Sequence, residues 1–371
     1  MFNSIFAKFT ATLTSVVLFL GTVLGFYVPS QTKEAEVYLD GEIKNVIYLI
    51  GDGMGFEHLE KTKRERDISL AMDTFPIKGS SRTRSFSNAV TDSAAGGTAL
   101  STGIRTRNSA VGVYPFDRKA RYSNPVSLTE ICRDRGMLTG VITTDTNSGA
   151  TPASFSAHTS DRYNTEEIVE DQYASGFNLI WGIADDVASK SGAEENGFTY
   201  VTTYSEMMAL EEGSRSFAQF KNDLWKTEQT DADTPTLEQM ALKAVDILDD
   251  TDEGFFLMIE GAHIDKHSHN NLSDEVTESV DGFDRTVEAM LEYAKADGET
   301  LVVVTADHET GGITAEGEFT SDGHTKADVP VLVYGSDKLI EQGEKLNNYE
   351  IPTRIAYLIG FTEEEFPSDC R

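Results

Sequence analysis

The sequence predicts an α/β fold with a mostly parallel central sheet that is flanked by helices on both faces. Two observations support this prediction. Apolar, strand-like runs alternate along the chain with segments of helical periodicity, which is typical of parallel sheets. Acidic and histidine side chains follow several of these runs, at the edge where open parallel sheets bind ligands. The runs expected to form buried strands are 45–50, 138–143, 254–259, 301–305 and 329–333.

The N-terminal residues have the composition of an export signal. Residues 9–32 carry no charge, and the centre of this stretch is strongly apolar. We interpret residues 1–30 as a signal peptide that is cut after Ser30, with an uncleaved membrane anchor as the alternative. Residues 31–371 are then expected to form a single catalytic domain in the periplasm, at the cell surface or in the medium.

Charge and cysteine content narrow the function classes. Asp and Glu outnumber Lys and Arg by 62 to 31, so the formal net charge is −31. Such an anionic surface disfavours binding to nucleic acid, and an anionic substrate would need local cations to attract it. The only cysteines are Cys132 and Cys370, which excludes a dense disulfide framework. Cys132 lies in a predicted helix and is expected to be a buried free thiol.

Two of the intervening helices are well marked. Residues 127–130 read SLTE, which is a capping box, and Gly136 offers a C-terminal stop. Residues 276–294 carry apolar side chains at spacings of three and four, opposite an acidic face that we expect to be solvated. Residues 171–233 are more polar and less periodic. We expect them to form a peripheral insertion over the sheet.

Ser93 stands at the expected start of another helix, within the sequence Thr-Asp-Ser-Ala-Ala-Gly-Gly. Unpaired N–H groups and the positive end of the helix dipole favour an alkoxide or a phosphate at such a position. These residues indicate a nucleophile, although Thr, Asp and Ser are also favoured helix caps. Asp92 is expected to cap this helix or to orient Arg162.

Acidic and imidazole groups follow three of the predicted strands. Asp52 lies in a Gly-Asp-Gly-Met-Gly turn after the first strand, Glu260 closes the third, and Asp307 with His308 follows the fourth. Because parallel strands end at the same edge, these side chains are expected to gather there. Gly-Asp-Gly is also a common surface turn, so this motif is weak evidence when it is taken alone.

The sequence also contains metal-ligand spacing. Asp265 and His269 are four residues apart, so they share one face if the segment is helical and can bind one cation. His308 and His324 add two imidazoles. Oxygen ligands mixed with histidines suit Zn²⁺, whereas Mg²⁺ prefers oxygen alone. A loop of charged surface residues is the alternative.

Four more histidines are present: His58, His158, His263 and His267. The first two lie on helical patterns and are expected to be packing or surface residues. His263 and His267 flank the expected ligands. The only role that we consider for them is to support those ligands by contacting them from behind.

Taken in order, these motifs resemble the alkaline phosphatase family over nearly the whole chain after the signal. They are IGDGMG at 50–55, TDSAAG at 91–96, ATPA at 150–153, EGA at 260–262, Asp265, His269, TADH at 305–308 and GHT at 323–325. The resemblance implies that family's fold. It also implies the hydrolysis of small phosphate monoesters to an alcohol and inorganic phosphate, and a homodimer.

The resemblance assigns a role to each candidate site residue. Ser93 would be the nucleophile that is phosphorylated, and Arg162 would clamp the phosphate. One Zn²⁺ would be held by Asp265, His269 and His324. A second Zn²⁺ would be held by Asp52, Asp307, His308 and the Ser93 oxygen. One Mg²⁺ would be held by Asp52, Thr151 and Glu260.

One position departs from the family pattern. Two residues before Thr151, where relatives often place Asp or His near the magnesium, this chain has Gly149. We therefore expect a magnesium that is held by fewer protein groups and more water, or a site that exchanges its metal readily. Lys266 is interpreted either as a water-mediated contact to phosphate or as a solvated surface lysine.

Two rival functions are considered. A phosphodiesterase, phosphomutase or sulfatase could share the sheet, but the serine at position 93 argues against some of these enzymes, and Arg162 favours a terminal phosphoryl group. The other rival is an exported protein that binds metal or phosphate without catalysis. Such a protein would keep the ligands and would have no need of Ser93.

Overall fold

The computed structural model describes residues 43–117, 124–249 and 251–366. The predicted signal segment and Cys370 lie outside the described residues. The strands are β1 (Asn45–Gly51), β2 (Ile77–Arg82), β3 (Leu138–Thr146), β4 (Leu179–Ile183), β5 (Thr199–Val201), β6 (Ser216–Phe220), β7 (Phe255–Gly261), β8 (Thr300–Thr305), β9 (Glu309–Thr310), β10 (His324–Thr325), β11 (Val329–Tyr334) and β12 (Lys345–Asn347).

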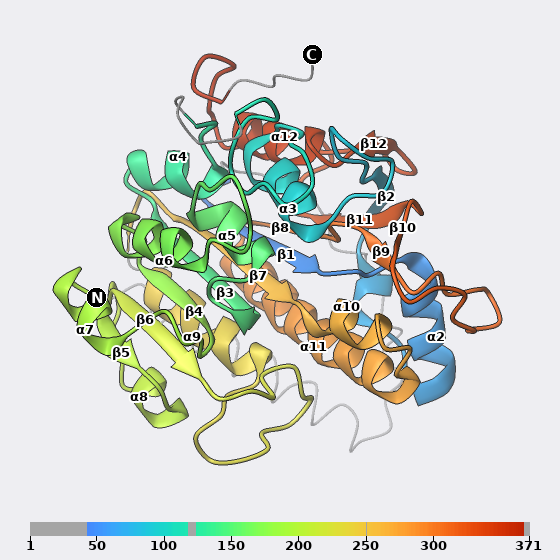
Figure 1. The fold of residues 1–371 in the computed structure, drawn as a ribbon, viewed down its shortest axis with the longest axis horizontal. Coiled ribbons are helices and arrows are strands. Elements are labelled where there is room, and N and C mark those ends of the chain that lie inside the picture. The colour runs from blue at the N-terminus through green and yellow to red at the C-terminus, as the bar shows by residue number, and fades with distance from the viewer. Residues whose placement is uncertain (1–42, 118–123, 250, 367–371) are drawn as a thin grey trace, which may run out of the picture. The chain divides into compact units, whose positions relative to one another are not determined.

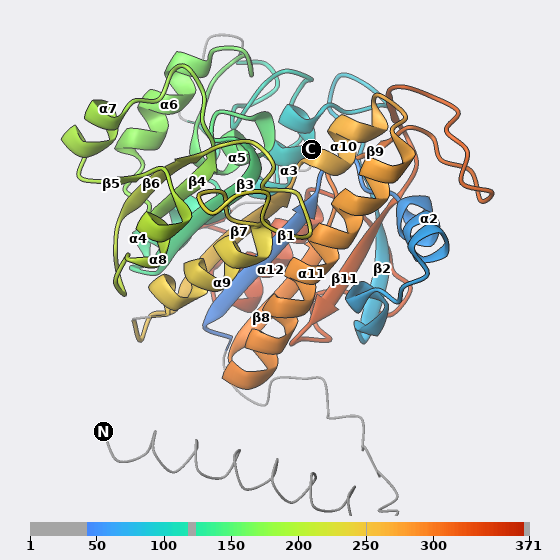
Figure 2. The ribbon, with the colours of Figure 1, turned by 90° about the horizontal axis from the view of Figure 1, so that it is seen from below.

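The helices that connect these strands cover both faces of the sheet (Figures 1 and 2). They are α2 (Phe56–Arg66), η1 (Ala71–Thr74, a 3₁₀ turn), α3 (Ser93–Thr102), α4 (Leu128–Asp134), α5 (Ala150–Ser156), α6 (Thr165–Ala174), α7 (Lys190–Glu195), α8 (Tyr204–Met208), α9 (Leu237–Leu248), α10 (His263–Ser268), α11 (Ser273–Asp297) and α12 (Glu350–Leu358). Within the described residues, no helix is both long enough and apolar enough to cross a membrane.

Ten strands form one mixed sheet in the order β12-β2-β11-β8-β1-β7-β3-β4-β6-β5. All five predicted strands are present in it. The pairings around β1 are parallel, to β7 on one side and to β8 on the other. β11 was expected among parallel strands but runs antiparallel to both β8 and β2. The prediction of a mostly parallel sheet is confirmed, with β11 as the exception.

Alternate side chains of the central strands enter separate cores on the two faces. Ile47 and Leu49 of β1 pack on one face with the apolar sides of α9 and α11. Tyr48 and Ile50, which point the other way, pack with residues of α4, α5 and α12. This alternation follows from the two-residue period of a strand. Because both faces are covered, the strands read as continuous apolar runs in the sequence.

Several local predictions are also confirmed. Ser127 caps α4 in a capping box with Glu130, and the predicted apolar stripe of α11 is buried from Val276 to Ala294. Cys132 is a buried free thiol. The prediction for residues 171–233 was wrong, because β4, β5 and β6 from this segment extend the main sheet. Strands of three to five residues are too short to give a clear periodic signal.

The central strands deliver their carboxyl ends to one place. β8, β1, β7 and β3 are neighbours and run parallel, so the residues that follow them meet at one edge. Ile50 of β1 is in register with Glu260 of β7 and with Thr305 of β8. Glu260 is in register with Thr143 of β3. Asp52 and Asp307 lie two residues beyond Ile50 and Thr305, so the register brings them to the same edge as Glu260.

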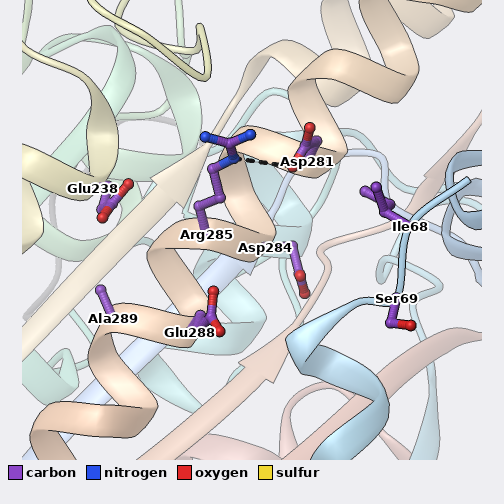
Figure 3. Close-up of a pocket in the computed structure, with 8 residues that line it drawn as sticks. All are labelled: Ile68, Ser69, Glu238, Asp281, Asp284, Arg285, Glu288 and Ala289. Atoms are coloured by element: carbon purple, nitrogen blue, oxygen red, sulfur yellow. Dashed lines mark hydrogen bonds and ion pairs between the residues drawn. The ribbon is translucent and has the colours of Figure 1, made fainter. Parts of the chain in front are cut away.

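A separate cavity of about 510 Å³ lies beside α11 (Figure 3). It shares no lining residue with the carboxyl edge described above, and its walls include Asp281, Asp284, Arg285 and Glu288. Asp284 is buried and accepts hydrogen bonds from the backbone N–H groups of Ala71 and Met72, at 2.7 and 2.9 Å. It therefore holds the start of η1 against the long helix.

This contact makes part of the stability depend on pH. Burial is the main cause that raises the pKa of Asp284 to about 6, although the two backbone hydrogen bonds lower it; the nearby Glu288 and Asp281 add to the rise. Because the pKa is higher in the folded chain, the unfolded chain releases this proton first as the pH rises. The contribution of Asp284 to the free energy of unfolding should therefore fall by about 2 kcal/mol between roughly pH 4 and 6.

Denaturant unfolding of Asp284→Asn across pH 4 to 7 checks this prediction. At low pH the variant should be less stable than the wild type. As the pH rises from 4 to 7, the variant should lose less of its free energy of unfolding than the wild type does. Glu292→Gln, on the exposed part of the same helix, is the control for removing one acidic group. Parallel pH profiles for Asp284→Asn and the wild type would contradict the prediction.

Candidate active site

Ser93 is the first residue of α3, and Asp92 is the cap of this helix. The Asp92 Oδ1 atom accepts a hydrogen bond from the Ala95 N–H at 3.0 Å, and Oδ2 accepts one from the Ser109 N–H at 2.7 Å. The predicted capping role of Asp92 is therefore confirmed. Because Asp92 does the capping, the Ser93 hydroxyl is not used for it and lies 3.2 Å from Nε2 of His308.

Two glycines allow α3 to lie close to the sheet edge. A Cβ atom at Gly96 would come within 3.0 Å of the Asp307 Cβ, and one at Gly97 would come within 2.9 Å of the Ser154 Oγ. The Gly-Gly pair would weaken an exposed helix, but here it lets the start of α3 reach the edge at which β8 ends. This packing positions Ser93 beside His308.

Arg162 reaches the same region from the loop after α5. Its backbone N–H donates to the Ser109 carbonyl at 2.7 Å, which fixes the loop, and its Nη1 atom lies 3.7 Å from the Asp92 Oδ2. The side chain is partly exposed. The guanidinium is among the charges that lower the pKa of Asp52 and of His308. The predicted orienting contact from Asp92 is thus present, and the positive charge of Arg162 acts on the edge where Ser93 lies.

A first cluster of ligand-type side chains consists of Asp52, Asp307 and His308. The His308 Nε2 atom lies 3.1 Å from the Asp307 Oδ2 and 3.4 Å from the Asp52 Oδ1. All three side chains are buried. Together with Ser93, which contacts the same imidazole nitrogen, these are the four residues that the resemblance assigned to the second zinc.

A second cluster consists of Asp265, His308 and His324. His269, which the sequence placed with Asp265 and His324, is also close. Its Nε2 atom lies 3.1 Å from the His324 Nε2 and 3.4 Å from the Asp265 Oδ2. The expected sharing of one helical face by Asp265 and His269 is confirmed, because α10 carries the first and is capped by the second. His308 stacks on His324 at 3.6 Å and so forms the wall between the two clusters.

Backbone carbonyls orient two of these imidazoles. The Nδ1 atom of His269 lies 2.6 Å from the Asp322 carbonyl, and that of His324 lies 2.9 Å from the Thr91 carbonyl. A carbonyl can only accept, so each Nδ1 carries the proton and each Nε2 presents its lone pair to the cluster. Thr310 performs a related task, because its hydroxyl donates to the Asp265 Oδ1 at 2.5 Å.

The electrostatics of the two clusters favour a cation. Burial and neighbouring carboxylates hold the pKa of Asp52 well above its usual value, and burial with Asp265 raises the pKa of Asp307 to about 7. Burial and the other imidazoles hold the pKa of His308 well below its usual value. Asp52 Oδ1 and Asp307 Oδ2 are buried and have no hydrogen-bond donor in the part of the chain that the structure describes. Buried acids without a counter-charge are costly, so these donor atoms fit a bound divalent cation.

The third predicted set is Asp52, Thr151 and Glu260. Thr151 is buried at the first turn of α5, and its hydroxyl has no hydrogen-bond partner among the described residues. The Glu260 carboxylate accepts a hydrogen bond from Thr143, and burial, with Asp145 as the next cause, raises its pKa to about 8. The unpaired oxygens of Asp52 and Thr151 again fit a hard cation.

The remaining histidines lie outside these clusters. His58 is buried in α2, with Nδ1 accepting from the Gly55 N–H at 3.1 Å. The helical placement of His158 was wrong: it follows α5 and binds Glu130 at 2.9 Å. His263 and His267 pack on Trp225, with ring centroids 5.5 and 4.4 Å apart.

Lys266 and Asp145 form an ion pair. The Lys266 side chain is 41% exposed, so it is a surface lysine as one interpretation expected, but its charge is paired with Asp145. The water-mediated contact to phosphate stays a prediction. Asp145 is a site residue that the sequence reasoning missed. It lies near the end of β3, just as Asp52, Glu260 and Asp307 lie at or just beyond the ends of other strands. The same rule about strand ends could have found it.

Comparison with known proteins agrees with this geometry. A family model described as alkaline phosphatase matches residues 43–189 and 186–321 of the chain. The chain belongs to the alkaline phosphatase family. This confirms the resemblance inferred from the motifs, and residues 43–321 of this family member contain nearly all of the clustered side chains described above, with His324 just beyond them.

Individual relatives support the family and the fold. Alkaline phosphatase 4 of Bacillus subtilis is 32% identical over an alignment of 308 residues, which covers 75% of this chain and 64% of that protein. The chain thus spans less than two thirds of that relative's length. The solved alkaline phosphatase of the Antarctic bacterium TAB5 is 29% identical with a TM-score of 0.74, covering 86% of this chain and 99% of that one. A variant of the TAB5 enzyme has been solved with Mg bound in its M3 site.

Proposed function

We propose that this chain hydrolyses phosphate monoesters to an alcohol and inorganic phosphate through a phosphoserine on Ser93. One observation carries the proposal. The Ser93 hydroxyl, at the N-terminus of α3, lies 3.2 Å from an imidazole nitrogen that also faces Asp52 and Asp307. A protein that only bound metal would not need a hydroxyl at this point, in a place where a helix start favours an anion.

The metals belong to the proposal as well. Asp265, His269 and His324 would hold one Zn²⁺, and Asp52, Asp307, His308 and Ser93 would hold another. Asp52, Thr151 and Glu260 would hold Mg²⁺. When bound, such ions supply Lewis acidity, which lowers the pKa of hydroxyl groups and neutralises charge that develops on oxygen.

The residues of the chain bind and orient the phosphoryl group. Arg162 carries a planar guanidinium that can bind two phosphoryl oxygens, and Asp92 limits its motion from 3.7 Å away. Ser93 is the first residue of α3, so its hydroxyl lies at the positive end of the helix dipole, which favours the dianion. Arg162 thus selects a terminal phosphoryl group, because a diester offers fewer free oxygens.

The chemistry takes two displacements. In the first, a bond forms between the Ser93 oxygen and phosphorus while the ester P–O bond breaks, and the alcohol leaves with the proton that the serine lost. In the second, water attacks the phosphoserine, and the serine recovers a proton as inorganic phosphate leaves. Splitting the reaction in this way replaces one difficult step with two easier ones.

Assembly and location are also proposed. A homodimer rests on the family resemblance, and export rests on the composition of residues 1–30. Gel filtration with light scattering, and fractionation of cells that express the full chain, test these two proposals.

The activity is tested by assaying the purified chain on p-nitrophenyl phosphate and on bis-p-nitrophenyl phosphate, each with and without a chelator. We expect turnover of the monoester that is lost on chelation, and at least about a hundredfold lower kcat/KM for the diester. Arg162→Ala should raise KM for the monoester, while Arg105→Ala, at an arginine packed on Tyr349, is the control. Phosphate binding without chelator-sensitive turnover would support the non-catalytic rival instead.

A further inference from the structure

The end of β3 departs from regular pairing at one point. Ile142 is paired with Trp181 of β4, but the next pair is Thr146 with Ile183, so β3 has two extra residues in this interval. Such a bulge re-aims the side chains within it. It is accommodated by Gly182, where a Cβ atom would lie 2.6 Å from the Asp145 carbonyl oxygen. The bulge therefore sets the position of Asp145.

The Asp145 carboxylate occupies the space beside Gly149. A Cβ atom at Gly149 would lie 2.7 Å from the Asp145 Oδ2 and 2.9 Å from its Cγ. Position 149 has no room for a side chain because a side chain from position 145 is already there. Gly149 caps α5, and Thr151, with its unpaired buried hydroxyl, is two residues further along.

Two contacts fix this carboxylate, and a third fixes the backbone that carries it. The Asp145 Oδ1 atom accepts from the Thr146 N–H at 2.7 Å and forms the ion pair with Lys266. The Asp145 N–H donates to the Thr143 hydroxyl at 2.8 Å, and that hydroxyl donates to Glu260. The negative charge of Asp145 helps to raise the pKa of Glu260, while Lys266 lowers it. Asp145 is thus connected to Glu260 through one threonine.

We propose that Asp145 supplies to the third metal position the carboxylate that Gly149 lacks, and that Lys266 holds it there. The inference rests on the proposed function, because that function assigns a Mg²⁺ to Asp52, Thr151 and Glu260. It changes the expectation drawn from Gly149 alone. The site keeps an acid at this place in space, so its affinity for Mg²⁺ is not weakened by the glycine.

Equilibrium dialysis measures this effect directly. Protein loaded with Zn²⁺ is dialysed against graded Mg²⁺, and bound Mg²⁺ per chain is counted by mass spectrometry. Asp145→Asn should weaken Mg²⁺ binding by about 10- to 100-fold, which is typical of residues behind metal ligands. Glu344→Gln is the matched control, since Glu344 is an acid of similar exposure, paired with Arg354 next to the strand at the far side of the sheet.

A swap of positions separates the metal role from a structural one. Asp145→Ala combined with Gly149→Asp should bind Mg²⁺ within a few-fold of the wild type. The φ of −54° at Gly149 suits any residue, and the clash with the Asp145 carboxylate is removed, which leaves a contact of 3.0 Å to the Thr146 carbonyl oxygen for a small backbone shift to relieve. Unchanged Mg²⁺ affinity in Asp145→Asn, or no recovery in the swap, would overturn the inference. So would a wild type that binds no Mg²⁺. Turnover of p-nitrophenyl phosphate by the same wild-type sample then shows whether the proposed function itself still stands.

Discussion

Replacing Ser93 with Ala is expected to lower turnover of p-nitrophenyl phosphate by on the order of a thousandfold or more, because the residue that forms the covalent bond is lost. The rapid release of one equivalent of p-nitrophenol before steady state should disappear. The metal content should be unchanged, since Asp52, Asp307 and His308 still converge without the serine. Quenched-flow kinetics and metal analysis of the same sample measure all three effects.

Ser101→Ala is the matched control. Ser101 is a buried serine on the same helix, and its hydroxyl donates to the Thr98 carbonyl at 3.2 Å. Its replacement shows how much turnover is lost when a hydroxyl is removed from α3 at a position away from the sheet edge. If Ser93→Ala turned over the substrate as fast as Ser101→Ala, Ser93 would not be the nucleophile.

Removing the metal ions is expected to abolish turnover and also to make stability depend on pH. In the metal-free chain, burial and neighbouring carboxylates raise the pKa of Asp307 to about 7 and that of Glu260 to about 8. The folded chain therefore keeps protons that the unfolded chain has already released above about pH 4 to 5. The free energy of unfolding therefore falls as the pH rises from about 4 to about 8, and it falls no further on account of these two groups above about pH 8.

Bound cations would remove this dependence, because they hold the carboxylates in the ionised form. The difference in Tm between metal-loaded protein and stripped, desalted protein should therefore grow between pH 5.5 and 8.5. Differential scanning calorimetry at several pH values measures it, and readdition of Zn²⁺ and Mg²⁺ at each pH is the control. A difference that stays constant or shrinks as the pH rises would contradict the proposed metal sites.

Much of the fold could be predicted because the central strands are buried on both faces. Burial makes them continuous apolar runs, and each of the five predicted runs forms a strand. The direction of β11 could not be predicted, since an apolar run looks the same in either direction. Strands β4 to β6, which form one side of the sheet, were missed because they are short and lie in a polar segment.

The candidate site was predictable where its side chains lie in recognisable motifs. The convergence of Asp52, Asp307 and His308 was expected from strand ends, and that of Asp265 with His269 from helical spacing. The place of His324 beside Asp265 was implied only by the family resemblance. Sequence could not show that carbonyls of Thr91 and Asp322 orient two of the imidazoles, because backbone contacts between distant segments leave no mark on residue type. Asp145 also follows the end of a predicted strand, so the strand-end rule could have found it, but the bulge that places its carboxylate beside Gly149 has no clear sequence signal.

The bulge in β3 has an evolutionary consequence. Asp145, Gly149 and Gly182 occupy one small volume, so the effect of a substitution at any one of them depends on which residues stand at the other two. Residues that share space in this way do not contribute additively. An acid introduced at position 149 would be harmful while Asp145 is present and useful once it is gone. The three positions are therefore expected to change together among descendants of this chain. A scan that changes one position at a time would detect only the harmful effect of an acid at position 149.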